Sequence, residues 1–159
     1  GGSLANRARL LLEIVHEVRR VAGAEVPVFV RVSATDWLEP EGLTLEDSVT
    51  VAGWVREAGG DVMDVSTGGN VTGVTIPVGP GYQVPFAHQV KTLSAVEVNA
   101  VGLITTAAQA NDIVQSRQAD AVMLGREMMR DPHFPLRAAH ELGVDIDYWP
   151  KQYLRARWR

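Results

Sequence analysis

The sequence has no cysteine among its 159 residues, which excludes a disulfide framework, a thiolate nucleophile and a metal site built on cysteine. Histidine is also scarce, and no pair of histidines has the spacing that suggests a metal. We therefore predict no metal site. The four histidines are His16, His88, His133 and His140.

Long apolar runs and a strong excess of one charge are missing as well. No run approaches the roughly 18 residues of a membrane span, and the N-terminus lacks a signal-peptide pattern. The net charge of -4 and the pI near 5.5 argue against a nucleic-acid or an anionic-membrane surface. With 46% apolar and 21% charged residues, we expect a globular cytoplasmic protein without a nucleic-acid or membrane partner.

What the sequence does contain is a repeat of short apolar runs, each followed by a segment with helical spacing. After a leading helix from Leu4 to about Val21, the runs lie near residues 28, 62, 98 and 121. Such regular alternation predicts an α/β fold with a parallel sheet and right-handed crossovers. Four such βα units after a leading helix correspond to half of a (β/α)8 barrel.

Start and stop signals give approximate bounds for the later helices. These helices are expected from Leu43 to Ala58, Val84 to Leu93, Ala107 to Ser116 and His133 to Leu142. Hydroxyl and amide side chains stand where N-caps are needed. The candidate caps are Ser3 or Asn6, Thr44, and Thr105 or Thr106.

The fourth apolar run stops at a glycine that is followed at once by an arginine, Gly125-Arg126. A glycine at a strand-to-helix junction lets the backbone approach a ligand closely, and the first N–H groups of the helix can bind an anion. An arginine there adds a bidentate phosphate donor. The two residues are therefore a candidate phosphate site. The alternative is that Gly125 only opens a turn and Arg126 is a solvated surface charge.

Other strand ends also carry residues that could face a ligand. Arg31 lies near the end of the first strand, which is otherwise apolar on both faces, as in a strand buried on each side. It either pairs with a carboxylate such as Asp36 or Asp64, or faces the electron-rich edge of a ligand. Gly68 and Gly102 follow the second and third strands. In a (β/α)8 barrel such ends form the active-site rim, and phosphate is often held after the seventh and eighth strands.

Seven short phrases are spread in order over nearly the whole chain. They begin at Gly1 (GGSLANR), Val28 (VFVRVS), Asp64 (DVSTG), Gly81 (GYQVPFA), Ala100 (AVGLIT), Leu124 (LGREMMRDP) and Gln152 (QYLR). Each phrase is weak alone, and together they are a strong signal: the chain resembles the C-terminal half of the Old Yellow Enzyme family of FMN-dependent ene-reductases. The resemblance is closest to the bacterial xenobiotic-reductase-like branch.

The resemblance implies roles for particular residues. Arg31 would meet the pyrimidine edge of the isoalloxazine near N1 and O2, where a fixed cation favours the reduced anionic flavin. Gly102, Gly125 and Arg126 fall on the strand ends that bind the FMN phosphate in that family. Arg155 matches a C-terminal arginine that reaches into a neighbouring subunit's active site. An alternative for the C-terminus is a disordered tail whose arginines only aid solubility.

The resemblance also implies an activity. FMN would accept a hydride from NADPH or NADH and pass it to an activated alkene such as an enone. Residues 1–145 would form the half barrel on the FMN-phosphate side, and residues 146–159 an aromatic and basic arm at a subunit interface. The family's substrate-gripping histidine pair or His/Asn pair and its active-site tyrosine have no counterpart here, so we assign no catalytic residue.

Two other readings remain open at this stage. The chain could be a catalytically incomplete half barrel, which would self-associate as a homo-oligomer or need its N-terminal half. A half barrel leaves edge strands and an apolar interior uncovered, and both favour association. A (β/α)8 enzyme that binds phosphate without flavin chemistry ranks last, because it explains only Gly125-Arg126.

Overall fold

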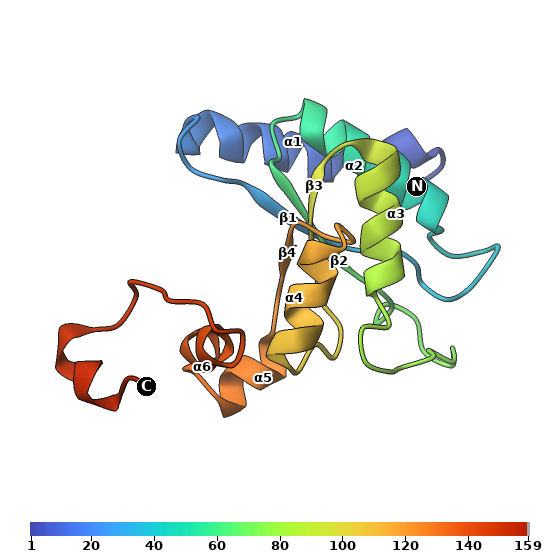
Figure 1. Cartoon of the computed structure of the whole chain (residues 1–159). Coiled ribbons are helices and arrows are strands. Elements are labelled where there is room, and N and C mark those ends of the chain that lie inside the picture. Colours follow the sequence, from blue (N-terminus) through green and yellow to red (C-terminus); the bar gives the residue numbers. More distant parts are fainter. Residues whose placement is uncertain (159) are drawn as a thin grey trace.

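The computed structural model describes residues 1–158, and its centre is a parallel sheet of four strands (Figure 1). The strands lie in sequence order, each parallel to the next. β1 spans Phe29–Ser33, β2 Val62–Ser66, β3 Glu97–Ala100 and β4 Ala121–Val122. Because one helix stands between each pair of successive strands, this arrangement confirms the predicted half of a (β/α)8 barrel.

Helices cover one face of the sheet and extend beyond β4 (Figure 1). α1, α2 and α3 follow one another along the sheet, α4 packs on β4, and α6 packs on α4. Their bounds are α1 Leu4–Ala22, α2 Leu45–Glu57, α3 Val84–Ser94, α4 Ala107–Gln115, α5 Gly125–Arg130 and α6 Phe134–Glu141, followed by the 3-10 helix η1, Lys151–Ala156.

Three of these helices begin at a side-chain cap that the sequence predicted. The hydroxyl of Ser3 accepts the N–H of Asn6 at 3.3 Å, and that of Thr44 accepts the N–H of Asp47 at 3.2 Å. Thr106 caps α4 in the same way. Each bond satisfies one of the N–H groups that a helix leaves free at its start.

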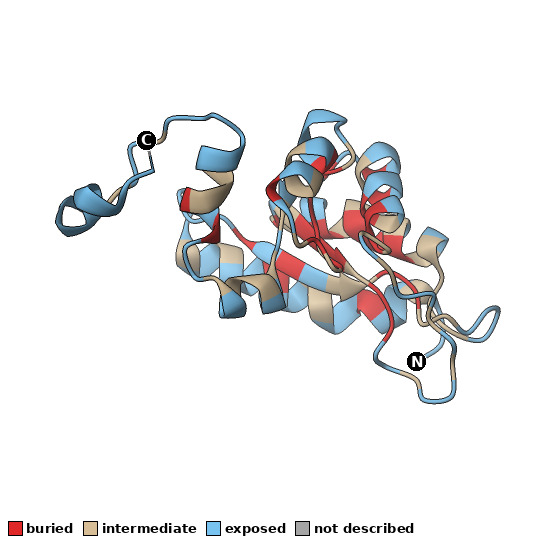
Figure 2. Ribbon diagram, turned by 60° about the horizontal axis from the view of Figure 1, so that its bottom comes forward, coloured by how far each residue is buried: buried red, intermediate tan, exposed pale blue. Residues whose placement is uncertain are grey.

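The core lies between the sheet and its helices (Figure 2). Val30, Met63 and Val98 stand at the same register on β1, β2 and β3 and point into this core. Val55 of α2 and Val90 of α3 are fully buried against the same layer. Burial of this apolar layer is the main source of stability for the sheet and its helices.

The opposite face of the sheet is open at its β1 end. β1 alternates, with Val30 buried and its neighbours Phe29 and Arg31 exposed. The expectation that this strand is buried on both faces is therefore wrong. The helices cover only the outer face, and in a closed barrel the inner face is covered by the other strands and by the side chains that fill the interior.

β4 is shorter than predicted and pairs only through Ala121 and Val122. It is also the last strand of the sheet, and β3 ends opposite it at Ala100, so there is no further ladder to extend. Within residues 1–158, none of the helices combines the length and the apolar character needed to cross a membrane.

Candidate functional site

One cavity of about 260 Å³ is lined by Arg31 of β1, by Ser66 at the end of β2 and by residues that follow β3 and β4. Its lining includes all four residues predicted to hold a cofactor, which are Arg31, Gly102, Gly125 and Arg126. These residues lie up to 95 positions apart in the sequence (126 minus 31). They meet here because parallel strands end at the same edge of a sheet.

Arg31 reaches this cavity from the inner face of the sheet. Its Nε donates to Asp64, its in-register neighbour on β2, and Asp64 also accepts the amide of Asn99 from β3 at 3.0 Å. The Asp64 side chain is 5% exposed and that of Arg31 is 53% exposed. Of the two predicted partners Asp64 is the one used. Nη2 of Arg31 also contacts the sulfur of Met123 at 2.7 Å, and the rest of the guanidinium stays exposed at the cavity.

Gly102 occupies a backbone position that only glycine adopts easily, with a φ of +123°. A Cβ at this position would lie 2.9 Å from the side-chain nitrogen of Gln83 and 3.2 Å from its Cβ. The glycine is therefore required by the protein itself. Among the described residues, no hydrogen bond occupies the N–H of Gly102 or of Leu103, so both donors are left for solvent or a ligand.

Gly125 opens α5 without such constraints. Its φ is not in the left-handed region, and a Cβ there would meet nothing within 4 Å. α5 also lacks the side-chain cap that α1, α2 and α4 have. The absence of a side chain at Gly125 leaves open space on the cavity wall, as close approach of a ligand to the backbone requires.

Arg126 has no hydrogen bond or ion pair with any residue in the described part of the chain. Its neighbour in the lining, Arg130, is instead paired with Glu127 at 2.8 Å. The lining therefore contains three arginines and one carboxylate, Glu127. This excess of positive charge favours an anionic ligand.

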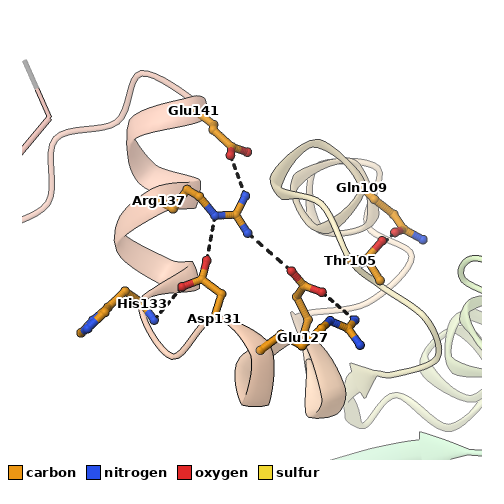
Figure 3. A network of polar contacts seen from close by, with 8 residues as sticks. Thr105, Gln109, Glu127, Asp131, His133, Arg137 and Glu141 are labelled. Carbon is orange, nitrogen blue, oxygen red and sulfur yellow. Dashed lines mark hydrogen bonds and ion pairs between the residues drawn. The ribbon is translucent and has the colours of Figure 1, made fainter.

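Behind this wall, Arg137 of α6 connects α5 with α6 (Figure 3). Its guanidinium lies 2.7 Å from Asp131, 2.6 Å from Glu141 and 3.5 Å from Glu127. The hydrogen bond from Arg137 holds the pKa of the Asp131 carboxyl below its ordinary value. Sequence reasoning missed this network, although the four-residue spacing of Arg137 and Glu141 on one helix indicates an ion pair.

Gln83 also lines the cavity, and sequence reasoning did not identify it. It precedes α3, and its buried side chain lies between the ends of β2 and β3. Gly68, by contrast, does not line the cavity. A Cβ at Gly68 would lie 2.6 Å from Ile76 and 3.2 Å from Trp37, so this glycine allows loops to pack rather than a ligand to approach.

Arg155 does not belong to this cavity. It is exposed in η1, and the segment that carries it lies away from the sheet (Figure 1). The tail nevertheless folds back on α6, because Trp158 stacks on His140 with ring centroids 5.3 Å apart and packs edge-on against Trp149. Arg159, the last residue of the predicted arm, lies outside the described residues.

Comparison with known proteins places this geometry in context. The chain is 46% identical over 156 residues to the NADPH dehydrogenase of Bacillus cytotoxicus, and the match covers 98% of this chain. It covers 44% of that relative, so the chain spans less than half the length of the curated protein it matches.

Two solved structures have similar folds. A 2-naphthoyl-CoA reductase in complex with 2-naphthoyl-CoA matches with a TM-score of 0.76 and 26% identity, over 91% of this chain and 22% of that one. Morphinone reductase in complex with tetrahydroNAD matches with a TM-score of 0.63 and 26% identity, over 96% of this chain and 38% of that one. The sequence profile of one family matches residues 1–145, which is most of the chain. The chain therefore belongs to the NADH:flavin oxidoreductase / NADH oxidase family.

Proposed function

We propose that this chain forms the FMN-phosphate side of an FMN-dependent NAD(P)H oxidoreductase that reduces activated C=C bonds. The observation that carries the proposal is the single cavity lined by Arg31, Gly102, Gly125 and Arg126. Because the chain belongs to a flavin oxidoreductase family, FMN is the anionic ligand that we expect this positively charged cavity to bind.

The β3 and β4 ends fit the phosphate of FMN. Arg126 has its guanidinium unpaired among the described residues, and the N–H groups of Gly102 and Leu103 lack partners there. The start of α5 adds further N–H groups beside Gly125. Charge-assisted hydrogen bonds from an arginine and several backbone donors are typical of phosphate recognition.

The β1 end fits the flavin ring. Asp64 holds Arg31 by its Nε and Met123 contacts its Nη2, so Nη1 is the nitrogen left to bind the electron-rich pyrimidine edge. A cation fixed there favours negative charge on the reduced ring. When bound, FMN would supply the redox chemistry, accepting a hydride from NADPH or NADH and passing it to an alkene such as an enone.

The tail supplies a second element of the proposal. We infer that residues 146–159 form an arm at a subunit interface, with Arg155 directed to the active site of a neighbouring subunit. Support comes from its exposed apolar residues, since Tyr153 is 57% and Leu154 52% exposed beside the exposed Arg155. Exposed aromatic and arginine side chains are enriched at protein interfaces.

The open inner face of the sheet supports a further point. Phe29 is 54% exposed there, on the edge strand β1. Since an uncovered edge strand and apolar face favour association, we propose that flavin binding needs a complementary barrel half, with a homo-oligomer of this chain as the alternative.

The test is a flavin titration on two samples. The purified chain is titrated with FMN alone, and then together with the N-terminal half of the Bacillus cytotoxicus NADPH dehydrogenase, while flavin absorbance and NADPH-dependent enone reduction are recorded. We expect weak or no binding by the chain alone, and a yellow, active protein after complementation. Turnover by the chain alone would contradict the need for a partner. Absence of FMN binding in both samples would contradict the proposed function.

Arg155→Ala tests the arm in the flavin-binding form identified by that titration. We expect altered turnover or substrate KM with FMN still bound, because the side chain lies outside the FMN cavity of its own chain. Arg117→Ala, which changes an exposed arginine at the end of α4, is the matched control. Loss of flavin from the Arg155 variant would show that the arm was assigned wrongly.

A further inference from the structure

Gln83 joins the ends of two strands beside the cavity. It is 4% exposed, and its side-chain oxygen accepts the N–H of Thr67 at 2.6 Å and the Thr67 hydroxyl at 3.0 Å. Its side-chain nitrogen donates to the carbonyl of Val101 at 3.1 Å. Thr67 directly follows β2 and Val101 directly follows β3, so one amide connects both exits to the start of α3.

The loop after β3 depends on this connection for its shape. Gly102 and Leu103 have positive φ values of 123° and 51° in succession, which is an unfavourable conformation for a residue such as leucine. Gln83 holds the loop from one side through Val101, and the N–H of Gly81 holds the carbonyl of Gly102 at 2.8 Å. Gly102 and Leu103 both line the cavity, and their backbone N–H groups have no partner among the described residues.

We propose that Gln83 is a positioning residue for phosphate recognition: it fixes the Gly102-Leu103 loop so that the backbone N–H groups of this loop bind the FMN phosphate. This inference rests on the proposed function, since it assumes that FMN occupies the cavity. It assigns no contact between Gln83 and the reacting part of the flavin.

The chemistry of the amide explains why glutamine stands at this position. A primary amide carries an acceptor and a donor on one terminal group, and here Thr67 uses the acceptor while Val101 uses the donor. A carboxylate could accept from Thr67 but could not donate to the carbonyl of Val101. An apolar side chain would leave both buried backbone groups without a partner.

The experiment compares FMN with riboflavin, which has the same ring and ribityl chain but no phosphate. The Kd of each is measured by flavin fluorescence on the flavin-binding form identified above, for the unsubstituted protein and for Gln83→Leu. We expect the ratio of riboflavin Kd to FMN Kd to fall about tenfold, since misplaced donors lose one or two charge-assisted hydrogen bonds. The Kd of riboflavin should stay within about twofold.

Two variants serve as references. Gln89→Leu makes the same change at an exposed position within α3, the helix that Gln83 precedes, and should leave the ratio unaltered. Arg126→Ala should lower the ratio through the direct phosphate contact. If Gln83→Leu does not fold, Gln83→Asn decides, because it keeps the amide but is one methylene too short to reach both Thr67 and Val101.

The possible outcomes separate the two proposals. If Gln83 variants keep the full ratio while Arg126→Ala lowers it, the inference is wrong and the proposed function stands. An equal loss for FMN and riboflavin would also overturn the inference, because it would show a role in the fold alone. If the unsubstituted protein binds FMN no better than riboflavin, the phosphate site itself fails and the inference fails with it.

Discussion

The molecule has two regions, and each is stabilised by a different kind of contact. The barrel body, residues 4–124, contains the sheet and helices α1 to α4, and every member of its connected buried core lies between Ala8 and Ala119. The C-terminal region, residues 125–158, contributes only Phe134 and Leu136 as buried apolar residues. Figure 2 shows the same contrast, with buried residues along the sheet and an exposed C-terminal segment.

Polar contacts take the place of a core in the C-terminal region. Arg137 alone contacts three carboxylates there, and its guanidinium also lies 5.0 Å from the centre of the Phe134 ring. Such exposed ion pairs stabilise far less than buried apolar surface does. We therefore expect the barrel body to be the more stable of the two regions.

The FMN cavity that we propose lies across the boundary between these regions. Arg31 belongs to the barrel body and is held by the buried Asp64, while Arg126 belongs to the C-terminal region and has no partner among the described residues. A ligand that contacts both arginines would connect the two regions. Each prediction below changes one side of this comparison.

The largest effect is expected for Met63→Ala in the barrel body. Met63 is fully buried in β2, and removal of such a side chain costs about 2–5 kcal/mol through lost burial and a remaining cavity. Urea unfolding of the variant measures the loss. Met129→Ala, at a residue 83% exposed in the C-terminal region, should change stability by less than about 0.5 kcal/mol. Equal losses of unfolding free energy in both variants would contradict the proposed difference between the two regions.

The two arginines should differ in what they contribute to flavin binding. Arg126→Ala is expected to weaken FMN about 10- to 100-fold and to leave riboflavin unchanged, because it removes hydrogen bonds to the phosphate alone. Arg31→Met should instead make the flavin potential more negative by roughly 30 mV, a tenfold change for a two-electron couple, because a cation beside the ring is lost. Titration and redox potentiometry measure the two effects. A shifted potential in Arg126→Ala with intact affinity would reverse the assignment.

The sequence predicted most of the fold because the signals for it are local. Apolar periodicity located the four strands, and hydroxyl side chains located the starts of α1, α2 and α4. The same signals placed Gly102 and Gly125 at strand ends, and the parallel arrangement then brought them together. Local pattern and topology were sufficient for this much.

Features set by distant neighbours could not be predicted. The choice of Asp64 over Asp36 as the partner of Arg31 depends on the register of β1 against β2, which apolar spacing does not specify. Nothing near Gln83 in the sequence indicates that its amide is buried between two strand exits. An uncovered interior was expected of a half barrel, but the alternating burial along β1 escaped prediction, because an apolar run does not show which of its side chains lie on the open face.

A smaller effect is expected for Arg137→Gln, which removes the ionic contacts between α5 and α6. Amide hydrogen exchange in α6 should become about threefold faster, while exchange in β2 stays unchanged, because exposed ion pairs are individually weak. Arg20→Gln, which breaks an isolated exposed pair with Glu17 on α1, is the matched control and should alter neither segment. Faster exchange in both α6 and β2 would mean that the regions unfold as one unit.

The smallest effect is the response of the C-terminal region to acid. The pKa of Asp131 is lowered in the folded protein, chiefly by the hydrogen bond from Arg137, so the folded state binds this proton less readily than the unfolded state does. Its contribution to stability is complete above the unfolded pKa of about 4 and is lost as the pH falls through the lower folded pKa.

The measurement is an acid titration of α6 amide resonances by NMR, from about pH 5 downward. We expect α6 signals to change before those of β2, and Asp131→Asn to remove part of this pH dependence. Asp61 in the barrel body offers the comparison. Its pKa is also lowered, chiefly by the N–H of Val28, but we expect the apolar core around β2 to persist when Asp61 is protonated. If Asp61→Asn flattened the α6 titration as much as Asp131→Asn does, the acid response would belong to the whole fold and not to the C-terminal region.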